Sequence, residues 1–271
     1  MTRTVFDKRT SLTEAVQLVQ DGDVLALGGM TLYRRPMAFV RELLRRDDPP
    51  TDLTLLCFTA SLESDLLVGA GLVSRVRSCY FGLEAFGLAP MFTKLATAGE
   101  IQVIEETEAS LAFGLRATLA GVSFMPGQGW IGTDLLRVRP DVRLIDDPYG
   151  SRQYVAFPAI KCDVAVIHAL RADQSGNAQV GRNMGVDPEL GLMSQRVIIT
   201  AEEVVERLED AIDIISLRVD AVVHAPQGAW PTSCFPLYAL DGHEIMRYSE
   251  SCPDGFQEYV ERFLSGDGGP P

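Results

Sequence analysis

The chain has 271 residues, and 46% of them are hydrophobic, which is enough to build a substantial buried core. Its 24 basic and 37 acidic side chains give a net charge of −13, which argues against a nucleic acid or an anionic membrane as partner. No apolar run approaches the roughly 20 residues that a membrane span needs, and the N-terminus is charged where a secretory signal would be apolar, so we expect a soluble, cytoplasmic protein.

The metal-binding residue types are scattered. The five cysteines include no C-x-x-C pair and the three histidines no H-x-x-x-H pair, so the sequence suggests no metal site. In a cytoplasmic protein we expect these thiols to be reduced.

The first half of the chain alternates between strands and helices. Ser11 and Glu14 form a capping box at the start of a helix. The apolar run 24–27 predicts a strand covered on both faces, and Pro36 suits the first position of the next helix. The following predicted elements are strands 53–58 and 75–80, helix 90–98, strand 101–104 and helix 109–120.

The second half is less regular. Residues 125–154 are rich in Gly, Pro and Asp and predict a long irregular loop, of a kind that is more often functional than idle. After it we expect strands 162–168, 196–200 and 221–224 and a helix over 201–208. The pattern predicts an α/β fold with an open, mostly parallel, doubly wound sheet, forming one domain over residues 1–264 with a disordered tail over 265–271.

Gly28 and Gly29 follow the first strand, where parallel sheets bind ligands. Glycines there would let backbone N–H groups approach an anion or a developing oxyanion, although a tight turn without a ligand is an equally good interpretation. Arg34 and Arg35 are expected to lie exposed beside this turn, where either could pair with a substrate carboxylate or simply be solvated. Neither G-x-G-x-x-G nor a GK[ST] loop occurs, so no dinucleotide or P-loop site is predicted.

Three blocks carry a family resemblance. They are Asp21-Gly22 followed by Gly28-Gly29 and a proline, the stretch 158–177 with its DVAVIH, AD and GN elements, and the stretch 220–238. Together they resemble the A subunits of family I coenzyme A transferases, and Arg34-Arg35-Pro36 favours the glutaconate CoA-transferase branch. The departures are Met30 and Arg34, where many relatives have phenylalanine and glycine.

The resemblance implies the fold shared by CoA transferases and ribose-phosphate isomerases, and a pair of subunits. In the family, a B-subunit glutamate attacks the acyl-CoA thioester to give an acyl anhydride and then an enzyme-CoA thioester. Its Ser-Glu-Asn-Gly type of context does not occur in this chain. We therefore expect one partner, the B subunit, in a heterodimer or heterotetramer. The expected substrates are acyl-CoA and a carboxylic acid, more specifically a dicarboxylic acid. Coenzyme A is then a substrate, and no resident cofactor is expected.

Candidate site residues come from the ends of several predicted strands. Glu105 is the candidate catalytic residue, because it is the first acid after its strand and corresponds to an acidic position in several A subunits. Glu106 and Glu108 are expected to be solvated or to favour the start of the next helix, and His168 to be a hydrogen-bonded core residue. The candidate substrate-binding residues are Gly28, Gly29, Met30, Thr31, Arg34, Thr59, Ser61 and Gln128.

Several alternatives stay open at this point. Thr59 and Ser61 could instead cap the following segment, and Gln128 could belong to a plain loop. On the same fold, a CoA-ester hydrolase, a ring-opening hydrolase or a decarboxylase could use Glu105 as base. A non-catalytic assembly subunit is the third possibility.

Overall fold

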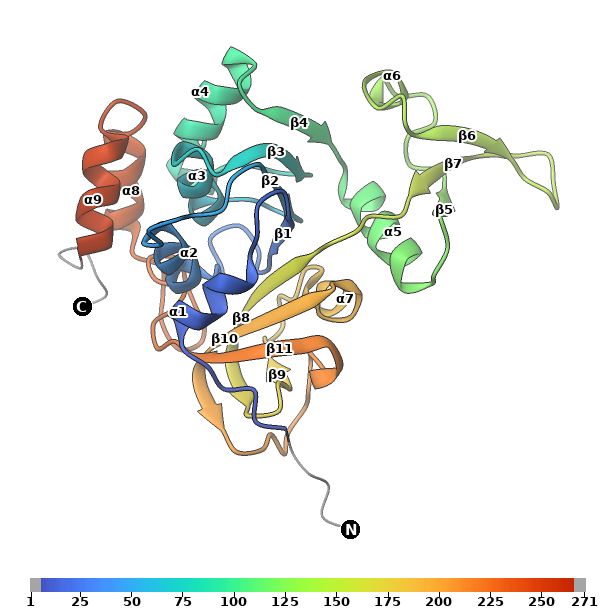
Figure 1. The fold of residues 1–271 in the computed structure, drawn as a ribbon. Coiled ribbons are helices and arrows are strands. Elements are labelled where there is room, and N and C mark those ends of the chain that lie inside the picture. The colour runs from blue at the N-terminus through green and yellow to red at the C-terminus, as the bar shows by residue number, and fades with distance from the viewer. Residues whose placement is uncertain (1–5, 266–271) are drawn as a thin grey trace, which may run out of the picture.

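A mostly parallel sheet forms the centre of the molecule (Figure 1) in the computed structural model, which describes residues 6–265. Seven of its eight strands run parallel, and the short β9 (Ala178–Gln179) pairs antiparallel with β8 at one end. The sheet is open and its central strands are covered on both faces, as the sequence predicted. In spatial order the parallel strands are β11 (Val219–His224), β10 (Arg196–Val205), β8 (Val164–Asp173), β1 (Val24–Leu27), β2 (Leu53–Cys57), β3 (Val73–Ser78) and β4 (Gln102–Glu105).

Two layers of apolar side chains pack on the sheet because successive residues of a strand point to opposite faces. In β1, Leu25 and Leu27 belong to the larger core on one face, whereas Ala26 belongs to the core on the other. The near-continuous apolar runs of the central strands follow from this double burial.

Helices cover both faces. The larger core lies under α1 to α4, with α8 and α9 packed outside that layer, and α5 and α7 cover the opposite face (Figure 1). The helices are α1 (Leu12–Ala15), α2 (Met37–Leu44), α3 (Leu62–Gly69), α4 (Pro90–Ala98), α5 (Glu108–Leu119), α6 (Leu135–Val138), α7 (Asp187–Met193), α8 (Gly242–Ser251) and α9 (Phe256–Ser265), with 3-10 turns η1 (Val16–Leu18), η2 (Glu84–Phe86) and η3 (Ser216–Arg218).

The region between α5 and β8 is not the irregular loop that was predicted. It is a three-stranded antiparallel sheet, β5 (Phe124–Gly127), β7 (Gln153–Pro158) and β6 (Arg143–Asp146), with α6 between β5 and β6. We call residues 124–158 the arm, because they stand away from the main sheet beyond α5 (Figure 1). The arm has a small core of its own, formed by Trp130, Val142, Val155 and Phe157.

Two further predictions are corrected. The helix expected over 201–208 is wrong, because β10 continues to Val205 and pairs with β8 through Glu203, Val204 and Val205. Tertiary pairing overrides the helical preference of this segment. Ser265, which was expected to begin a disordered tail, ends α9; the rest of that predicted tail lies outside the described residues.

Within residues 6–265, no helix is long and apolar enough to cross a membrane.

Candidate active site

The predicted site residues lie along one edge of the main sheet, where parallel strands end. Gly28 and Gly29 follow β1, Thr59 and Ser61 follow β2, and Glu105 ends β4. The structure joins the first two loops directly, because the N–H of Thr31 donates to Oγ1 of Thr59 over 2.8 Å. Glu105 lies three strands away from β1 in the sheet order, about 14 Å at the usual spacing of neighbouring strands.

The backbone amides of the glycine turn are all used within the chain. Gly28 N donates to Val166 O (2.9 Å), Gly29 N to Asp187 Oδ1 (3.0 Å) and Met30 N to Tyr33 O (2.9 Å), while Thr31 N binds Thr59. None of these four donors is free for an anion in this state. In this state the glycines serve close packing, in line with the alternative of a tight turn without a ligand, and contact of their amides with a ligand stays a prediction. A Cβ on Gly28 would lie 2.7 Å from the Asp187 carboxylate.

Arg34 is not exposed, contrary to the prediction. Its side chain is fully buried, and Nη2 forms an ion pair with Asp187 Oδ2 at 2.8 Å. Nη1 donates to His168 O (2.7 Å), and Nη2 also donates to Asn183 O (2.9 Å). The same carboxylate thus holds both Gly29 and Arg34. Arg34 therefore acts inside the wall of the site, and a direct contact with a substrate carboxylate is not supported by this geometry.

Arg35 forms a second buried ion pair. Its Nη2 lies 2.5 Å from Glu63 Oε1, and both side chains are fully buried. Burial works to lower the pKa of Arg35, but the charge and hydrogen bond of Glu63, together with the nearby Cys57 and Asp187, outweigh it and the pKa is raised. Ser61 occupies the N-cap position of α3 without capping it, since its hydroxyl is buried and has no hydrogen-bond partner among the described residues. The capping alternative for Ser61 is therefore wrong.

Arg182 is an exposed cation near the glycine turn that sequence analysis missed. The loop 180–185 lies over the turn, because Asn183 O accepts from Arg34 and a Cβ on Gly181 would lie 3.4 Å from the Tyr33 hydroxyl. Arg182 itself is exposed and forms no hydrogen bond or ion pair within residues 6–265. Only the folded chain brings this loop to the glycine turn, so no local sequence signal identified it.

Glu105 and Glu106 at the end of β4 have opposite environments. Glu105 is exposed. Glu106, which was expected to be solvated or to favour a helix start, is buried and pairs with Arg139 Nη1 at 2.8 Å. Glu108 is exposed at the first position of α5, as expected. Burial, together with the nearby charges of Glu108 and Glu106, raises the pKa of the Cys79 thiol to about 12.

Gln128 lies exposed in the loop that follows β5. This loop is tied to the start of α5, since Trp130 Nε1 donates to Thr107 Oγ1 over 3.0 Å. A Cβ on Gly129 would lie 3.7 Å from that of Ala109. Gln128 and Glu105 therefore flank the same junction between β4 and α5, away from the glycine turn.

A buried cluster lies on the side of the turn facing β10. His168, Glu202 and Cys234 bring potential ligand atoms within 4.8 Å of one another. His168 donates or accepts at both ring nitrogens, with Thr200 Oγ1 and Glu202 Oε1 at 2.8 Å each, and burial lowers its pKa. Glu202 also accepts from Tyr238 and from the Gln227 amide. These hydrogen bonds already satisfy the cluster and confirm the prediction that His168 is a bonded core residue.

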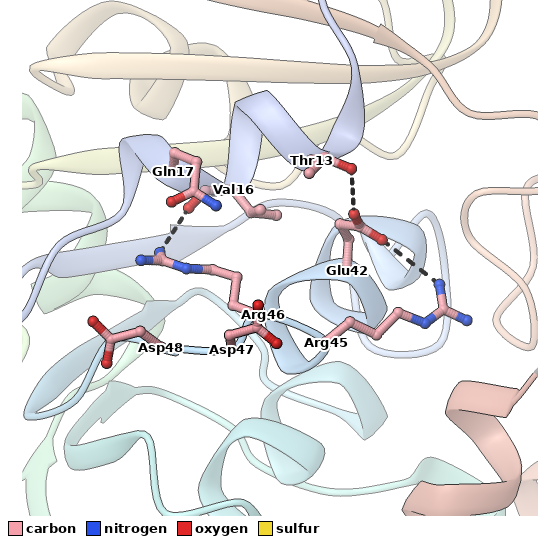
Figure 2. A pocket seen from close by; sticks show the side chains of 8 residues that line it. All are labelled: Thr13, Val16, Gln17, Glu42, Arg45, Arg46, Asp47 and Asp48. Carbon is pink, nitrogen blue, oxygen red and sulfur yellow. Dashed lines mark hydrogen bonds and ion pairs between the residues drawn. The ribbon is translucent and has the colours of Figure 1, made fainter.

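A polar hollow of about 380 Å³ lies at the other edge of the sheet, between α1 and the end of α2 (Figure 2). Glu42 binds the Thr13 hydroxyl at 2.6 Å and Arg45 at 3.6 Å, and Arg46 donates to Val16 O at 3.0 Å. Because it adjoins α1 and the end of α2, away from the carboxyl ends of the strands, this hollow is not part of the candidate site.

Comparison with known proteins identifies the family. The model of the coenzyme A transferase family matches residues 9–225. The chain belongs to the coenzyme A transferase family. It is 34% identical to the IpdA subunit of the cholesterol ring-cleaving hydrolase of Rhodococcus jostii, over 96% of this chain and 93% of that one. It is 30% identical to the A subunit of the 3-oxoadipate CoA-transferase of Pseudomonas knackmussii, over 94% and 93%.

Two solved structures share the fold over nearly the whole chain. The decarboxylase AibA/AibB matches with a TM-score of 0.88 and 30% identity, over 96% of this chain and 100% of that one. Glutaconate CoA-transferase from Acidaminococcus fermentans matches with a TM-score of 0.86 and 30% identity, over 95% and 87%. The chain also spans 61% of a longer uncharacterized protein of Archaeoglobus fulgidus, at 33% identity. These matches make it a CoA-transferase family chain of the A-subunit type.

Proposed function

We propose that this chain is the A subunit of a heteromeric CoA transferase, which moves CoA between an acyl-CoA and a dicarboxylic acid in the cytoplasm. The family membership and the A-subunit relatives support the reaction class. Coenzyme A would be a substrate, and the protein would need no resident cofactor.

The observation that carries this proposal is the state of the carboxylates around the candidate site. Asp187, Glu63 and Glu106 are buried, and each is paired with an arginine. A carboxylate that is committed to a buried ion pair is a poor nucleophile toward a thioester, because leaving the pair would strand a buried charge. Glu105 is exposed and outside these pairs, but the chain lacks the Ser-Glu-Asn-Gly type of context, so we expect the attacking carboxylate from the B subunit.

The covalent steps of the proposed reaction use only this carboxylate and the two substrates. The B-subunit glutamate attacks the thioester carbonyl, and CoA leaves as a thiolate, which gives a mixed anhydride. The thiolate then attacks the glutamyl carbonyl, so that the first acid leaves and an enzyme-CoA thioester forms. The acceptor acid repeats the two steps in reverse order and leaves as acyl-CoA.

This chain would supply the substrate-facing wall. We propose that Arg182 pairs with the distal carboxylate of a dicarboxylic substrate, since a guanidinium can bind a carboxylate in a bidentate manner. The two buried ion pairs would keep the adjoining glycine turn and the loop after β2 in place. Met30, Thr31, Thr59 and Gln128 remain candidate contacts for the substrate.

The experiment compares the isolated chain with the chain co-expressed with its B subunit. We expect CoA transfer only from the pair, and we expect borohydride or hydroxylamine, added with acyl-CoA, to modify the partner and not this chain. Transfer by the isolated chain, or a label on Glu105, would overturn the assignment of the nucleophile.

A second candidate function is a CoA-ester hydrolase or decarboxylase with Glu105 as base. Glu105 is exposed at the edge of the sheet, and proteins at 30 to 34% identity include one chain of a hydrolase and a decarboxylase. A partner that lacks the attacking glutamate would favour this function over transfer. If neither Glu105→Gln nor Arg182→Gln changes the activity of the two-subunit complex, this chain would instead be a non-catalytic assembly subunit.

A further inference from the structure

Arg139 of the arm is bound to the corner between β4 and α5. Its side chain is nearly buried, and Nη1 donates to the backbone oxygen of Glu105 at 2.7 Å and to Glu106 Oε1 at 2.8 Å. Its Nε and Nη2 bind the two carboxylate oxygens of Asp141 at 2.8 Å each. A single guanidinium thus spans the arm and the residue that we consider catalytic.

Glu106 is held from several sides at once. Besides Arg139, its Oε2 accepts from Ser110 Oγ at 2.5 Å, and Arg77 Nε lies 3.5 Å from Oε1. Charge-assisted hydrogen bonds of this kind are shorter and stronger than neutral ones, so they hold the Glu106 carboxylate in place. Because Glu106 is anchored inward, the adjacent Glu105 is left to project outward, in agreement with its exposure.

The arm is attached to the same corner at a second point. Trp130 donates to Thr107 Oγ1, and the Arg139 guanidinium lies over the Trp130 ring with a distance of 5.8 Å to the ring centroid. Both contacts use the arm's own core residue, Trp130, which is buried. A shift of the arm would therefore be transmitted to residues 105–107.

We propose that Arg139 is a positioning residue, which fixes the direction in which the Glu105 carboxylate leaves the sheet edge. This inference rests on the candidate catalytic role of Glu105, which the second candidate function assigns to it as a base. Displacing a reacting group by about 1 Å can cost on the order of 100-fold in rate. A lysine at position 139 would keep the charge but lose the fork that joins Glu105, Glu106 and Asp141.

The test uses the two-subunit complex and a double-mutant cycle. We expect Arg139→Lys to lower kcat by about tenfold or more with little change in KM, and Glu105→Gln to lower kcat at least as much. The kcat of the double variant should be no lower than that of Glu105→Gln alone, because Arg139 can no longer position a carboxylate that has been removed. Multiplicative losses, or an Arg139→Lys variant with wild-type kcat, would overturn the proposal.

Two controls separate positioning from general damage. Arg137→Lys on the neighbouring α6 changes a side chain that is 76% exposed, and it should leave kcat unchanged. If Arg139→Lys does not fold, Asp141→Asn loosens the same guanidinium from a half-exposed position and should give the same kcat loss and the same non-additivity. Wild-type kcat in folded Asp141→Asn would then count against the proposal.

The failure of this inference is distinguishable from the failure of the proposed function. If the wild-type complex hydrolyses or decarboxylates acyl-CoA and transfers none, the transferase assignment fails, while the cycle between Arg139 and Glu105 is measured on that other activity. If Glu105→Gln is fully active and transfer is normal, the positioning role fails and the transferase assignment stands.

Discussion

Replacement of Asp187 by asparagine tests whether one buried carboxylate holds the glycine turn. The Asp187 side chain is 1% exposed and accepts from the fully buried Arg34 and from Gly29 N. In Asp187→Asn the amide oxygen can satisfy Gly29, but the amide N–H groups then face the Arg34 donors. An uncompensated buried charge costs about 3–5 kcal/mol.

We therefore expect the free energy of unfolding to fall by about 4 kcal/mol, which corresponds to a fall of roughly 10 °C in Tm. The assay is urea unfolding, followed by circular dichroism, with the midpoint and slope fitted together. Glu189→Gln on the same helix is the matched control. Its partner Arg116 is 58% exposed, so that the loss there should stay below about 1 kcal/mol.

The double variant Arg34→Met with Asp187→Asn completes the cycle. Removing the stranded charge should make it clearly more stable than the sum of the single effects predicts. A loss of less than about 1 kcal/mol in Asp187→Asn, or strictly additive effects, would refute the argument that the ion pair and the turn form one unit.

Further predictions concern single residues. Burial raises the pKa of Asp65 to about 6, so the wild-type protein loses stability as the pH rises through that value. In urea unfolding, the free energy of unfolding of Asp65→Asn should gain up to about 3 kcal/mol relative to wild type between pH 4 and pH 7. Parallel curves of stability against pH for the two proteins would contradict this. Gly29→Ala would place a Cβ 2.6 Å from two carbonyl oxygens and should lower the free energy of unfolding by more than about 2 kcal/mol. The control Gly22→Ala, whose Cβ would meet no atom within 4 Å, should lower it by about 1 kcal/mol. Equal losses would contradict the argument that Gly29 is required for close packing. In the two-subunit complex, Arg182→Gln should raise KM about tenfold or more for a dicarboxylic acid and not for a monocarboxylic one, with Arg207→Gln as a control that changes neither.

The apolar strands and the overall fold could be predicted because double burial leaves a local signature. The run 24–27 is apolar at every position, and the neighbouring β2 and the first half of β8 are largely apolar. The helix predicted over 201–208 was wrong because these residues favour a helix locally, whereas in the folded chain β8 offers a long parallel edge with which they pair. The arm was missed because Gly and Pro mask its short strands, although 154–158 alternates between partly buried and buried positions.

The site could be predicted only in part, because its contacts join distant parts of the chain. Arg34 and Asp187 are 153 residues apart in the sequence, so no local pattern reveals that this arginine is neutralised inside the protein. The same holds for Arg182, which only the folded chain brings to the turn. The place of Glu105 at the edge of the sheet could be predicted, since it follows from the end of a strand, whereas its catalytic role stays a prediction.

The internal use of the glycine-turn amides has a consequence for inhibitor chemistry. The Asp187 carboxylate accepts from the Gly29 amide, so the protein carries its own competitor for that donor. Compounds with an anionic head group for this turn would have to displace a carboxylate held by Arg34 before they contacted the Gly29 amide. Head groups that bind Arg182 meet no such obstacle. Amide hydrogen exchange at Gly28 and Gly29 should then stay slow whether or not such a compound is bound.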